Sequence, residues 1–329
     1  MARGGPGASG PPRGGLSSIE RVSTIPAPIE IESARSRPAL DDVADVVARV
    51  SPANRLSPDQ LVHYLSADPG SAQLVARRGT EAVGAATVAR SGRPGHQYTM
   101  VRVVPEHRRC GVGSAILEAA RDHAGRLRLD RIWGRIDATD MGSLRFAERN
   151  GLVESGREWI SVLEVTDAPS PMPPPPGVTV VSLAERPDLI RAAYDVHSEC
   201  LPDMPSPTPS LPAPFHEWVS QTLGGPGALP AAAMVALADG AVIGQAALAL
   251  EGDEGTAEHL LTCVRPGWRG RGVAGALKSA QIAWARQAGI RRLVTSNDAP
   301  NAAMLAVNQR LGYQVVSEGV LVEGPAQRA

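Results

Sequence analysis

The chain has 329 residues, of which 43% are hydrophobic and 20% charged, and its formal net charge is −1. This composition is typical of a globular protein of about two domains, at roughly 150 residues each. The near-neutral charge argues against broad nucleic-acid binding, which needs a basic surface. The three cysteines have no paired spacing, so neither a disulfide framework nor a metal site is expected. The sequence has no apolar run of 18 residues and no apolar leader near its N-terminus, which predicts a cytoplasmic protein without a membrane partner.

Residues 1–27 are mostly Gly, Pro, Ser and Arg, and we expect a disordered tail. The N-terminal half then occupies residues 28–168. Its hydrophobic pattern predicts a strand near 28–33, helices near 39–50 and 57–66, and strands near 72–77, 82–89 and 97–104. A helix at 112–125, a strand near 131–137, a helix at 140–149 and a strand near 156–165 complete this half.

The proline-rich stretch 169–176 predicts a polyproline-type linker and the main domain boundary. The C-terminal half, 177–329, repeats the same order of elements. Its pattern predicts strands at 178–183, 232–238, 241–250, 257–264, 291–296 and 313–322, and helices at 187–200, 214–223, 273–287 and 300–310. Each half is therefore β-rich first and then alternates strands with helices, which predicts a mixed α/β sheet with helices on both faces.

One motif occurs twice, 161 residues apart, each time between a predicted strand and a predicted helix. The first copy reads VVPEHRRCGVG from Val103, and the second reads VRPGWRGRGVA from Val264. The match continues at the same offset to Gly151 and Gly312 without an insertion. A register held over this length indicates a duplicated domain.

The repeated turn has the features of an anion-binding site. Its glycines Gly111 and Gly272 permit a positive φ and a close approach of the backbone to a ligand. The helix that follows presents free N–H groups and the positive end of its dipole, which suits a pyrophosphate. Four arginines add positive charge, namely Arg108, Arg109, Arg269 and Arg271. A merely solvated turn is the alternative, but two copies with the same flanking elements disfavour it. The glycine spacing fits neither a dinucleotide-binding nor a Walker motif.

The pattern Pro-x-x-Arg-x-x-Gly-x-Gly/Ala after a strand resembles motif A of the GNAT superfamily of acyl-CoA-dependent N-acetyltransferases. In the second half, the segment from Asn301 to Tyr313 (NAAMLAVNQRLGY) is also similar to that family's next helix and its Leu-Gly-aromatic end. The resemblance covers roughly 28–168 and 177–325. It implies two tandem GNAT-like domains, each a mostly antiparallel twisted sheet with helices on both faces, and acetyl-CoA as the cofactor.

The resemblance also implies which residues bind acetyl-CoA. The strand before each turn should separate from its neighbour and hydrogen-bond the pantetheine through its backbone, and the turn should hold the pyrophosphate. The residues implied in the N-terminal half are Val101, Arg102, Val103, Arg108, Arg109, Cys110, Gly111, Val112, Gly113 and Ser114. Those in the C-terminal half are Thr262, Cys263, Val264, Arg269, Gly270, Arg271, Gly272, Val273, Ala274, Gly275 and Asn301. Asp140 occupies the position of Asn301 in the first half.

Acetyl transfer to an amine needs an oxyanion donor and usually a proton acceptor. Some members of the family use a glutamate on the strand before the turn, and the matching residue is Glu258, our candidate catalytic base. The 161-residue offset places Gln97 there in the first half, and Gln97 cannot accept a proton. Two-residue alternation predicts that Cys263, a small core residue, points to the opposite face of the strand from Glu258.

Two alternatives to a base at Glu258 remain open. Glu258 follows the acidic stretch 251–254, and one alternative is that it is another solvent-exposed carboxylate. His96, Tyr98 and His259 are neighbours that could act through water instead. The family's usual tyrosine acid has no counterpart, because Asn308 and Ala147 occupy its two positions. A CoA thiolate can leave unaided, and Tyr313 is expected in the core.

Together these features predict an acetyl-CoA-dependent N-acetyltransferase that acts on a primary amine of a small molecule, with the C-terminal half as the catalytic one. Acidic residues such as Asp203 and Glu217, in or beside the proline-rich loop 200–215, favour a cationic amine. A non-catalytic acyl-CoA sensor or scaffold is the alternative, and catalysis in both halves is a third reading. Either a monomer or a homodimer is expected, because the tandem arrangement can itself mimic a dimer.

Overall fold

The structure is a computed structural model that describes Met1 and residues 27–52, 55–204, 210–250 and 255–327. The expected disordered tail therefore lies almost entirely outside the described residues, as do the acidic stretch 251–254 and part of the loop 200–215. Among the described residues, no helix is long and apolar enough to cross a membrane.

The N-terminal half follows the predicted order of elements. It consists of β1 (Ile29–Ser33), α1 (Arg37–Val50), α2 (Pro58–Ala67), β2 (Ala72–Arg78), β3 (Glu81–Arg90), β4 (His96–Val103), α3 (Val112–Arg126), β5 (Arg131–Asp137), α4 (Met141–Arg149) and β6 (Val153–Glu164). Local sequence explains the helix starts. The Ser36 hydroxyl caps α1, and Ser57 and Gln60 form a reciprocal capping box at the start of α2.

The C-terminal half repeats this order. It consists of β7 (Val178–Ser182), α5 (Ile190–Cys200), α6 (Phe215–Leu223), β8 (Met234–Ala238), β9 (Ala241–Leu250), β10 (Thr256–Val264), α7 (Val273–Gln287), β11 (Arg292–Asp298), α8 (Ala302–Arg310) and β12 (Gln314–Pro325). The predicted helix at 187–200 begins as a short 3-10 turn, Pro187–Leu189, before α5. The segment 168–177 between β6 and β7 has no helix or strand.

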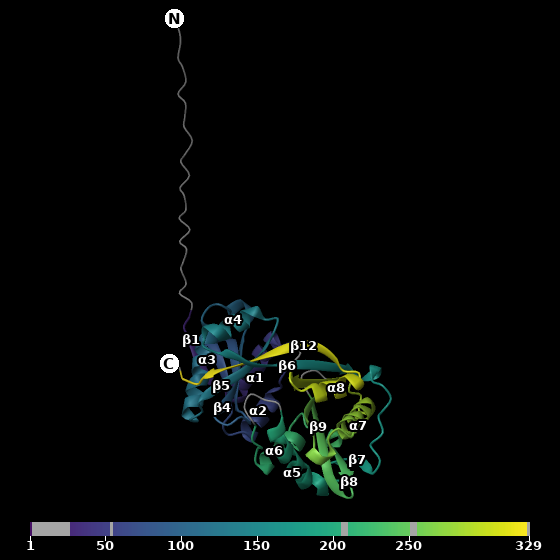
Figure 1. The fold of residues 1–329 in the computed structure, drawn as a ribbon. Coiled ribbons are helices and arrows are strands. Elements are labelled where there is room, and N and C mark those ends of the chain that lie inside the picture. The colour runs from purple at the N-terminus through teal and green to yellow at the C-terminus, as the bar shows by residue number, and fades with distance from the viewer. Residues whose placement is uncertain (2–26, 53–54, 205–209, 251–254, 328–329) are drawn as a thin grey trace.

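All twelve of these strands form one sheet, in the order β1-β2-β3-β4-β5-β12-β6-β11-β10-β9-β8-β7. The last strand of each half is therefore exchanged. β6 pairs with β11 of the second half, and β12 pairs with β5 of the first. The two exchanged strands also pair with each other, and Figure 1 shows them running side by side from one half into the other.

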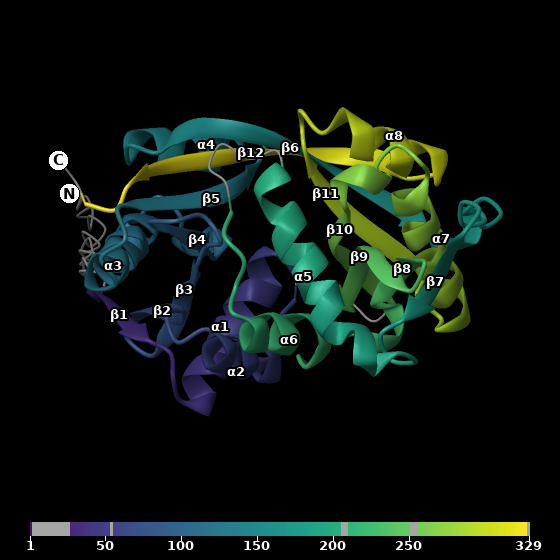
Figure 2. The same ribbon diagram turned by 60° about the horizontal axis from the view of Figure 1, so that its bottom comes forward.

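The helices cover both faces of this sheet. On β3, Gly84 faces α3, because a Cβ there would come within 2.8 Å of Ile116. α1 packs on the same strand, and α5 and α7 pack on β9 in the same way. α2 and α6 touch each other where the two halves meet (Figure 2). The predicted fold class is confirmed, with only the pairs β4–β5 and β10–β11 parallel.

Candidate functional site

The two repeated turns have the same geometry. Each leaves its strand through a single 3-10 turn, Pro105–His107 or Pro266–Trp268, and enters the next helix through a left-handed glycine. The φ angles of Gly111 and Gly272 are 83° and 88°, so both glycines are needed for the backbone path. In each turn an arginine Nε donates to the carbonyl that ends the strand. Arg108 reaches Val103 at 3.0 Å, and Arg269 reaches Val264 at 2.9 Å.

Neither helix that follows these turns has a side-chain cap at its N-terminus. The first-turn N–H groups of α3 and α7 are thus left for another acceptor, which is the arrangement that binds phosphate oxygens. These turns contain the residues predicted from sequence to hold the pyrophosphate. Asn301 and Asp140 lie at matching places, where each caps the start of the next helix, α8 or α4.

The strand before each turn separates from its parallel neighbour. β4 pairs with β5 only from His96 to Tyr98, although β4 continues to Val103. β10 pairs with β11 only from Thr256 to Glu258, although β10 continues to Val264. The unpaired backbone at 101–103 and at 262–264 is therefore available to an extended ligand on one edge.

The two halves differ in a β-bulge. On β10, Leu260 and Leu261 together lie opposite the single residue Ala247 of β9, whereas β4 pairs with β3 without a break. Such a bulge leaves a ladder position unpaired and reverses the alternation of side chains beyond it. Below the bulge the structural counterpart of Glu258 is therefore Tyr98, which like Glu258 ends the parallel pairing of its strand.

Two expectations based on uninterrupted alternation are wrong for this reason. Gln97 is not the counterpart of Glu258, because its side chain is buried on the opposite face and donates to the Ala120 carbonyl of α3 at 2.9 Å. Cys263 does not point away from Glu258. It packs with Val196 and Cys200 of α5, on the same face of the sheet as Glu258. Its predicted burial is confirmed.

A pocket of about 460 Å³ opens at the centre of the sheet, between the two halves. Glu258 and Leu260 of β10 line it from the second half, and Tyr98, Met100 and Arg102 of β4 line it from the first. Strands β5, β6, β11 and β12 supply Trp133, Arg135, Glu158, Ser296 and Leu321, and α2 supplies Gln60 and Tyr64. Glu258 thus lines the cleft with a half-buried side chain.

The charges in this pocket are coupled. Arg135 donates from Nη1 to Glu158 at 3.0 Å. Burial lowers the pKa of Arg135, but Glu158, together with Tyr98 and Glu258, outweighs this effect, so the pKa is raised. Burial raises the pKa of the Tyr98 phenol, and Glu158 and Glu258 add to this effect while Arg135 and Arg102 oppose it. Tyr98 is accordingly a neutral phenol and a poor proton acceptor at neutral pH.

The other proposed water-assisted bases do not face the pocket with Glu258. His259 is buried on the α7 side, where its Nε2 lies 2.5 Å from the hydroxyl of Tyr313. Burial, with the charge of Lys278, lowers the pKa of His259 well below its usual range. His96 is also buried, with Nδ1 2.7 Å from the Pro94 carbonyl. Tyr313 is in the core, as predicted.

Sequence reasoning missed the buried lysine of α7. Lys278 is the only lysine of the chain, and its Nζ donates to Oδ1 of Asn308 at 2.8 Å. Asn308 in turn donates to Asn297, in the part of β11 that has separated from β10. Burial lowers the pKa of Lys278 to about 7. The available signal was one lysine among many arginines, at a position where the first half has Leu117.

The proline-rich linker lies against α7. The backbone N–H of Met172 donates to the Ser279 hydroxyl at 2.7 Å, and Met172 packs on the cluster that contains Ile282 and Leu311. A Cβ on Gly275 would lie only 2.5 Å from Cε of Met172. Farther along the linker, Cγ of Pro175 would lie 3.8 Å from a Cβ on Gly272. We call residues 169–176 the strap, since they cover one face of α7 up to its N-terminal turn.

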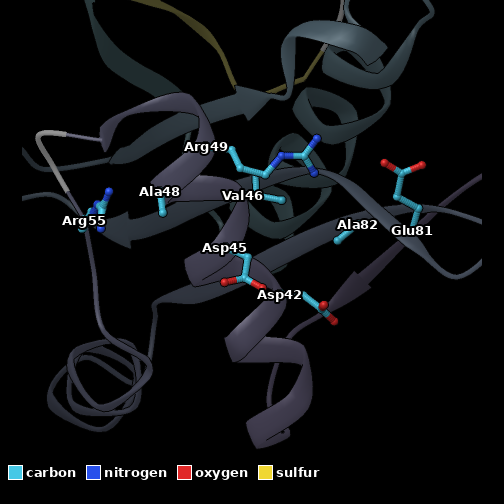
Figure 3. A pocket seen from close by; sticks show the side chains of 8 residues that line it. All are labelled: Asp42, Asp45, Val46, Ala48, Arg49, Arg55, Glu81 and Ala82. Atoms are coloured by element: carbon cyan, nitrogen blue, oxygen red, sulfur yellow. The ribbon is translucent and has the colours of Figure 1, made fainter.

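A second pocket, of about 520 Å³, lies beside α1 at the start of β3 (Figure 3). Its charged residues are Asp42, Asp45, Arg49, Arg55 and Glu81. None of the residues predicted to bind the cofactor or to act in catalysis lines it. Within the described part of the chain, no cluster of His, Cys, Asp or Glu is placed to hold a metal ion.

Comparisons with known proteins agree with this geometry. The model of the acetyltransferase (GNAT) family matches residues 41–152 and 190–313, one copy in each half. A GCN5-related N-acetyltransferase from Sphaerobacter thermophilus has a similar fold, at a TM-score of 0.72 and 20% identity, over 92% of this chain and 98% of that one. A tandem GNAT protein from the clavulanic acid biosynthesis pathway gives 0.73 and 20%, over 92% and 100%. No protein of curated function matches the sequence.

Proposed function

Because the chain belongs to the GNAT family of acetyltransferases, we propose that it transfers an acetyl group from acetyl-CoA to the primary amine of a small molecule, with the chemistry in the C-terminal half. The observation that carries this proposal is the position of Glu258. It lines the central cleft at the point where β10 leaves β11, next to the bulge and on the strand that leads into the turn at Gly272.

The donor site would use features present in both halves. The free N–H groups at the start of α3 and α7 suit the pyrophosphate, and the separated backbone of β4 and β10 suits the pantetheine. Bound acetyl-CoA would supply the thioester carbonyl. In the second half, Arg269 also forms an ion pair with Asp203 at 2.7 Å, and the strap covers the adjoining face of α7. Donor binding there competes with the strap.

Glu258 would accept the proton that the attacking amine loses. A carboxylate needs only to lie within hydrogen-bond reach of the amine or of one bridging water to act in this way. The bulge at Leu260 and Leu261 adds a second element, because a backbone N–H released from the ladder can stabilise an oxyanion. The first half has neither element, since Tyr98 replaces the carboxylate and β4 has no bulge.

The size and lining of the cleft favour a small acceptor. A volume of about 460 Å³ is in the range of small-molecule sites. Side chains from both halves line it, and those of the first half include residues of α2. The N-terminal half then serves as a wall of the acceptor site. The exchange of β6 and β12 gives one chain both halves of this cleft, so a monomer suffices for the reaction.

Titration calorimetry of the whole protein with acetyl-CoA tests the donor site. We expect binding, with one site lost in an Arg269→Ala/Gly272→Pro variant and any second site lost in the matched Arg108→Ala/Gly111→Pro variant. Absence of binding would overturn the proposal. Mass spectrometry of amine panels incubated with acetyl-CoA then tests the reaction. Binding without acetylation of any amine would favour the second candidate, a non-catalytic acyl-CoA sensor. The observation that supports this candidate is the intact turn of the first half, which has no carboxylate at the position of Glu258.

A further inference from the structure

Arg102 is a buried cation in the wall of the central pocket. It lies on β4, two and four residues beyond Met100 and Tyr98, which line the same pocket. The residue is 8% exposed, and its Nε has no hydrogen-bond partner among the described residues. A guanidinium stays charged in proteins, and a buried charge without a partner is costly. The position therefore requires a reason beyond folding.

The neighbouring charges do not neutralise Arg102. Glu158, the carboxylate on β6, is engaged by Arg135 at 3.0 Å. Burial lowers the pKa of Arg102, the charge of Arg135 lowers it further, and only the phenol of Tyr98 acts in the opposite direction. Within the described part of the chain, no carboxylate acts on Arg102 strongly enough to raise its pKa. The first-half wall of the pocket is thus a site of excess positive charge.

We infer that Arg102 binds an anionic group of the acceptor, so that the acceptor is a primary amine that also carries a carboxylate or a phosphate. This inference rests on the proposed acetyl transfer, and it assigns the N-terminal half a role in substrate selection. Arg102 presents a planar set of donors that match two oxygens of a carboxylate or phosphate. Its backbone stays available for the contact expected from sequence, because only the side chain takes part.

The arrangement gives recognition at two points. Glu258 faces the pocket from β10 and Arg102 faces it from β4. Tyr98 interacts electrostatically with both side chains. An amine held at the carboxylate and an anion held at the guanidinium would fix the acceptor across the cleft. A site with a buried polar group discriminates strongly against an analogue that lacks the matching group.

Matched acceptors test this inference. The panel contains β-alanine and 6-aminohexanoate, their primary amides, and phosphoethanolamine, each measured for acetylation in the presence of acetyl-CoA and for stabilisation in a thermal-shift titration without it. Three variants accompany the wild type, namely Arg102→Met, Arg102→Lys and the control Arg55→Met, in which the guanidinium lost lies on another segment lining the pocket.

The wild type should prefer a carboxylate or phosphate acceptor to the matched amide by roughly 10- to 100-fold in kcat/KM. Arg102→Met should lose this preference through a higher KM for the anionic acceptors. Arg102→Lys should keep part of it, and Arg55→Met should keep most of it. A preference for the carboxylate acceptors alone identifies the anionic group as a carboxylate. A preference for phosphoethanolamine alone identifies it as a phosphate.

Equal rates for acids and amides in the wild type, or an acid preference that survives in Arg102→Met, would overturn the inference while acetyl transfer still stood. The anionic acceptors could instead stabilise the wild type but not Arg102→Met, while no amine is acetylated. That result would support the anion site and overturn the proposed acetyl transfer. A wild-type protein stabilised by none of the anionic acceptors, and with no preference in turnover, would show that Arg102 binds no such group.

Discussion

Lys278 and Asn308 form a hydrogen bond of 2.8 Å, and both side chains are buried between α7 and α8. Among the residues that the structure describes, no carboxylate offsets the burial of Lys278, and the pKa of its ammonium falls to about 7. The bond connects α7 to the separated end of β11, because Asn308 also donates to Asn297 at 2.6 Å. In the first half the matching positions hold Leu117 and Ala147, which are buried apolar residues.

Replacing this lysine should stabilise the protein in a pH-dependent manner. The pKa of Lys278 is about 7 in the folded protein against 10.5 as the ordinary value. Between these pH values the unfolded chain holds a proton that the folded protein lacks, so stability rises with pH in this window, and the full penalty applies below pH 7. Lys278→Met should therefore gain about 2–4 kcal/mol below pH 7, after the cost of leaving Asn308 unpaired.

Urea unfolding of wild type and Lys278→Met at pH 6.5 and pH 9.5 measures this difference. The gain should shrink towards the higher pH, and Lys278→Arg should show no gain at either pH because it keeps a buried charge. An equal gain at both pH values would contradict the lowered pKa.

Glu258→Gln should lower kcat while leaving the binding of acetyl-CoA unchanged. The amide keeps the size of the side chain but cannot accept a proton, and loss of a general base costs roughly 10²- to 10⁴-fold. Tyr98→Phe should change kcat by less than about threefold, since a neutral phenol is not the base. Steady-state kinetics with an accepted amine, beside the exposed-carboxylate control Glu154→Gln, tests both. Full activity in Glu258→Gln would remove Glu258 from the mechanism.

Met172→Gly should strengthen donor binding in the second half. The Met172 side chain packs on α7 beside Gly275, so its removal weakens the covered state of the donor site. We expect the affinity for acetyl-CoA to rise by roughly 3- to 10-fold. Calorimetry in the Arg108→Ala/Gly111→Pro background isolates this half. Ser279→Ala, which removes the acceptor of the Met172 N–H, should act in the same direction. Unchanged affinity in both variants would mean that the strap does not compete with the donor.

Separate halves should be unable to fold as independent domains. Among the described strands, β6 pairs only with β11 and β12, both of which come from the C-terminal half. A fragment of residues 27–168 would expose both edges of β6 and one edge of β5, and such edges promote aggregation. Co-expression of 27–168 with 177–329 should yield a soluble 1:1 complex, whereas each alone should aggregate or self-associate in size-exclusion chromatography. A monomeric, folded fragment 27–168 would contradict this.

The elements, the duplication and the geometry of the two repeated turns could be predicted from sequence because each depends on short-range patterns. Gly111 and Gly272 illustrate this, since a positive φ before a helix has a local signature. The bulge at Leu260 and Leu261 could not be predicted, because it is a property of pairing with β9. Because of the bulge, two predictions were wrong: that Gln97 matches Glu258, and that Cys263 points to the opposite face from Glu258. The partners of β6 and β12 and the burial of Arg102 are likewise set by segments far away in the chain.

The exchange of strands also imposes an order on biosynthesis. A chain grows from its N-terminus, and domains generally fold as they emerge. Here β5 pairs with β12, which ends at Pro325, so this central position in the sheet stays empty until the segment 314–325 has been made. The cleft lined by Tyr98 and Glu258 is therefore completed only when β12 joins the sheet, and a ribosome that stalls before β12 leaves a product without a complete cleft.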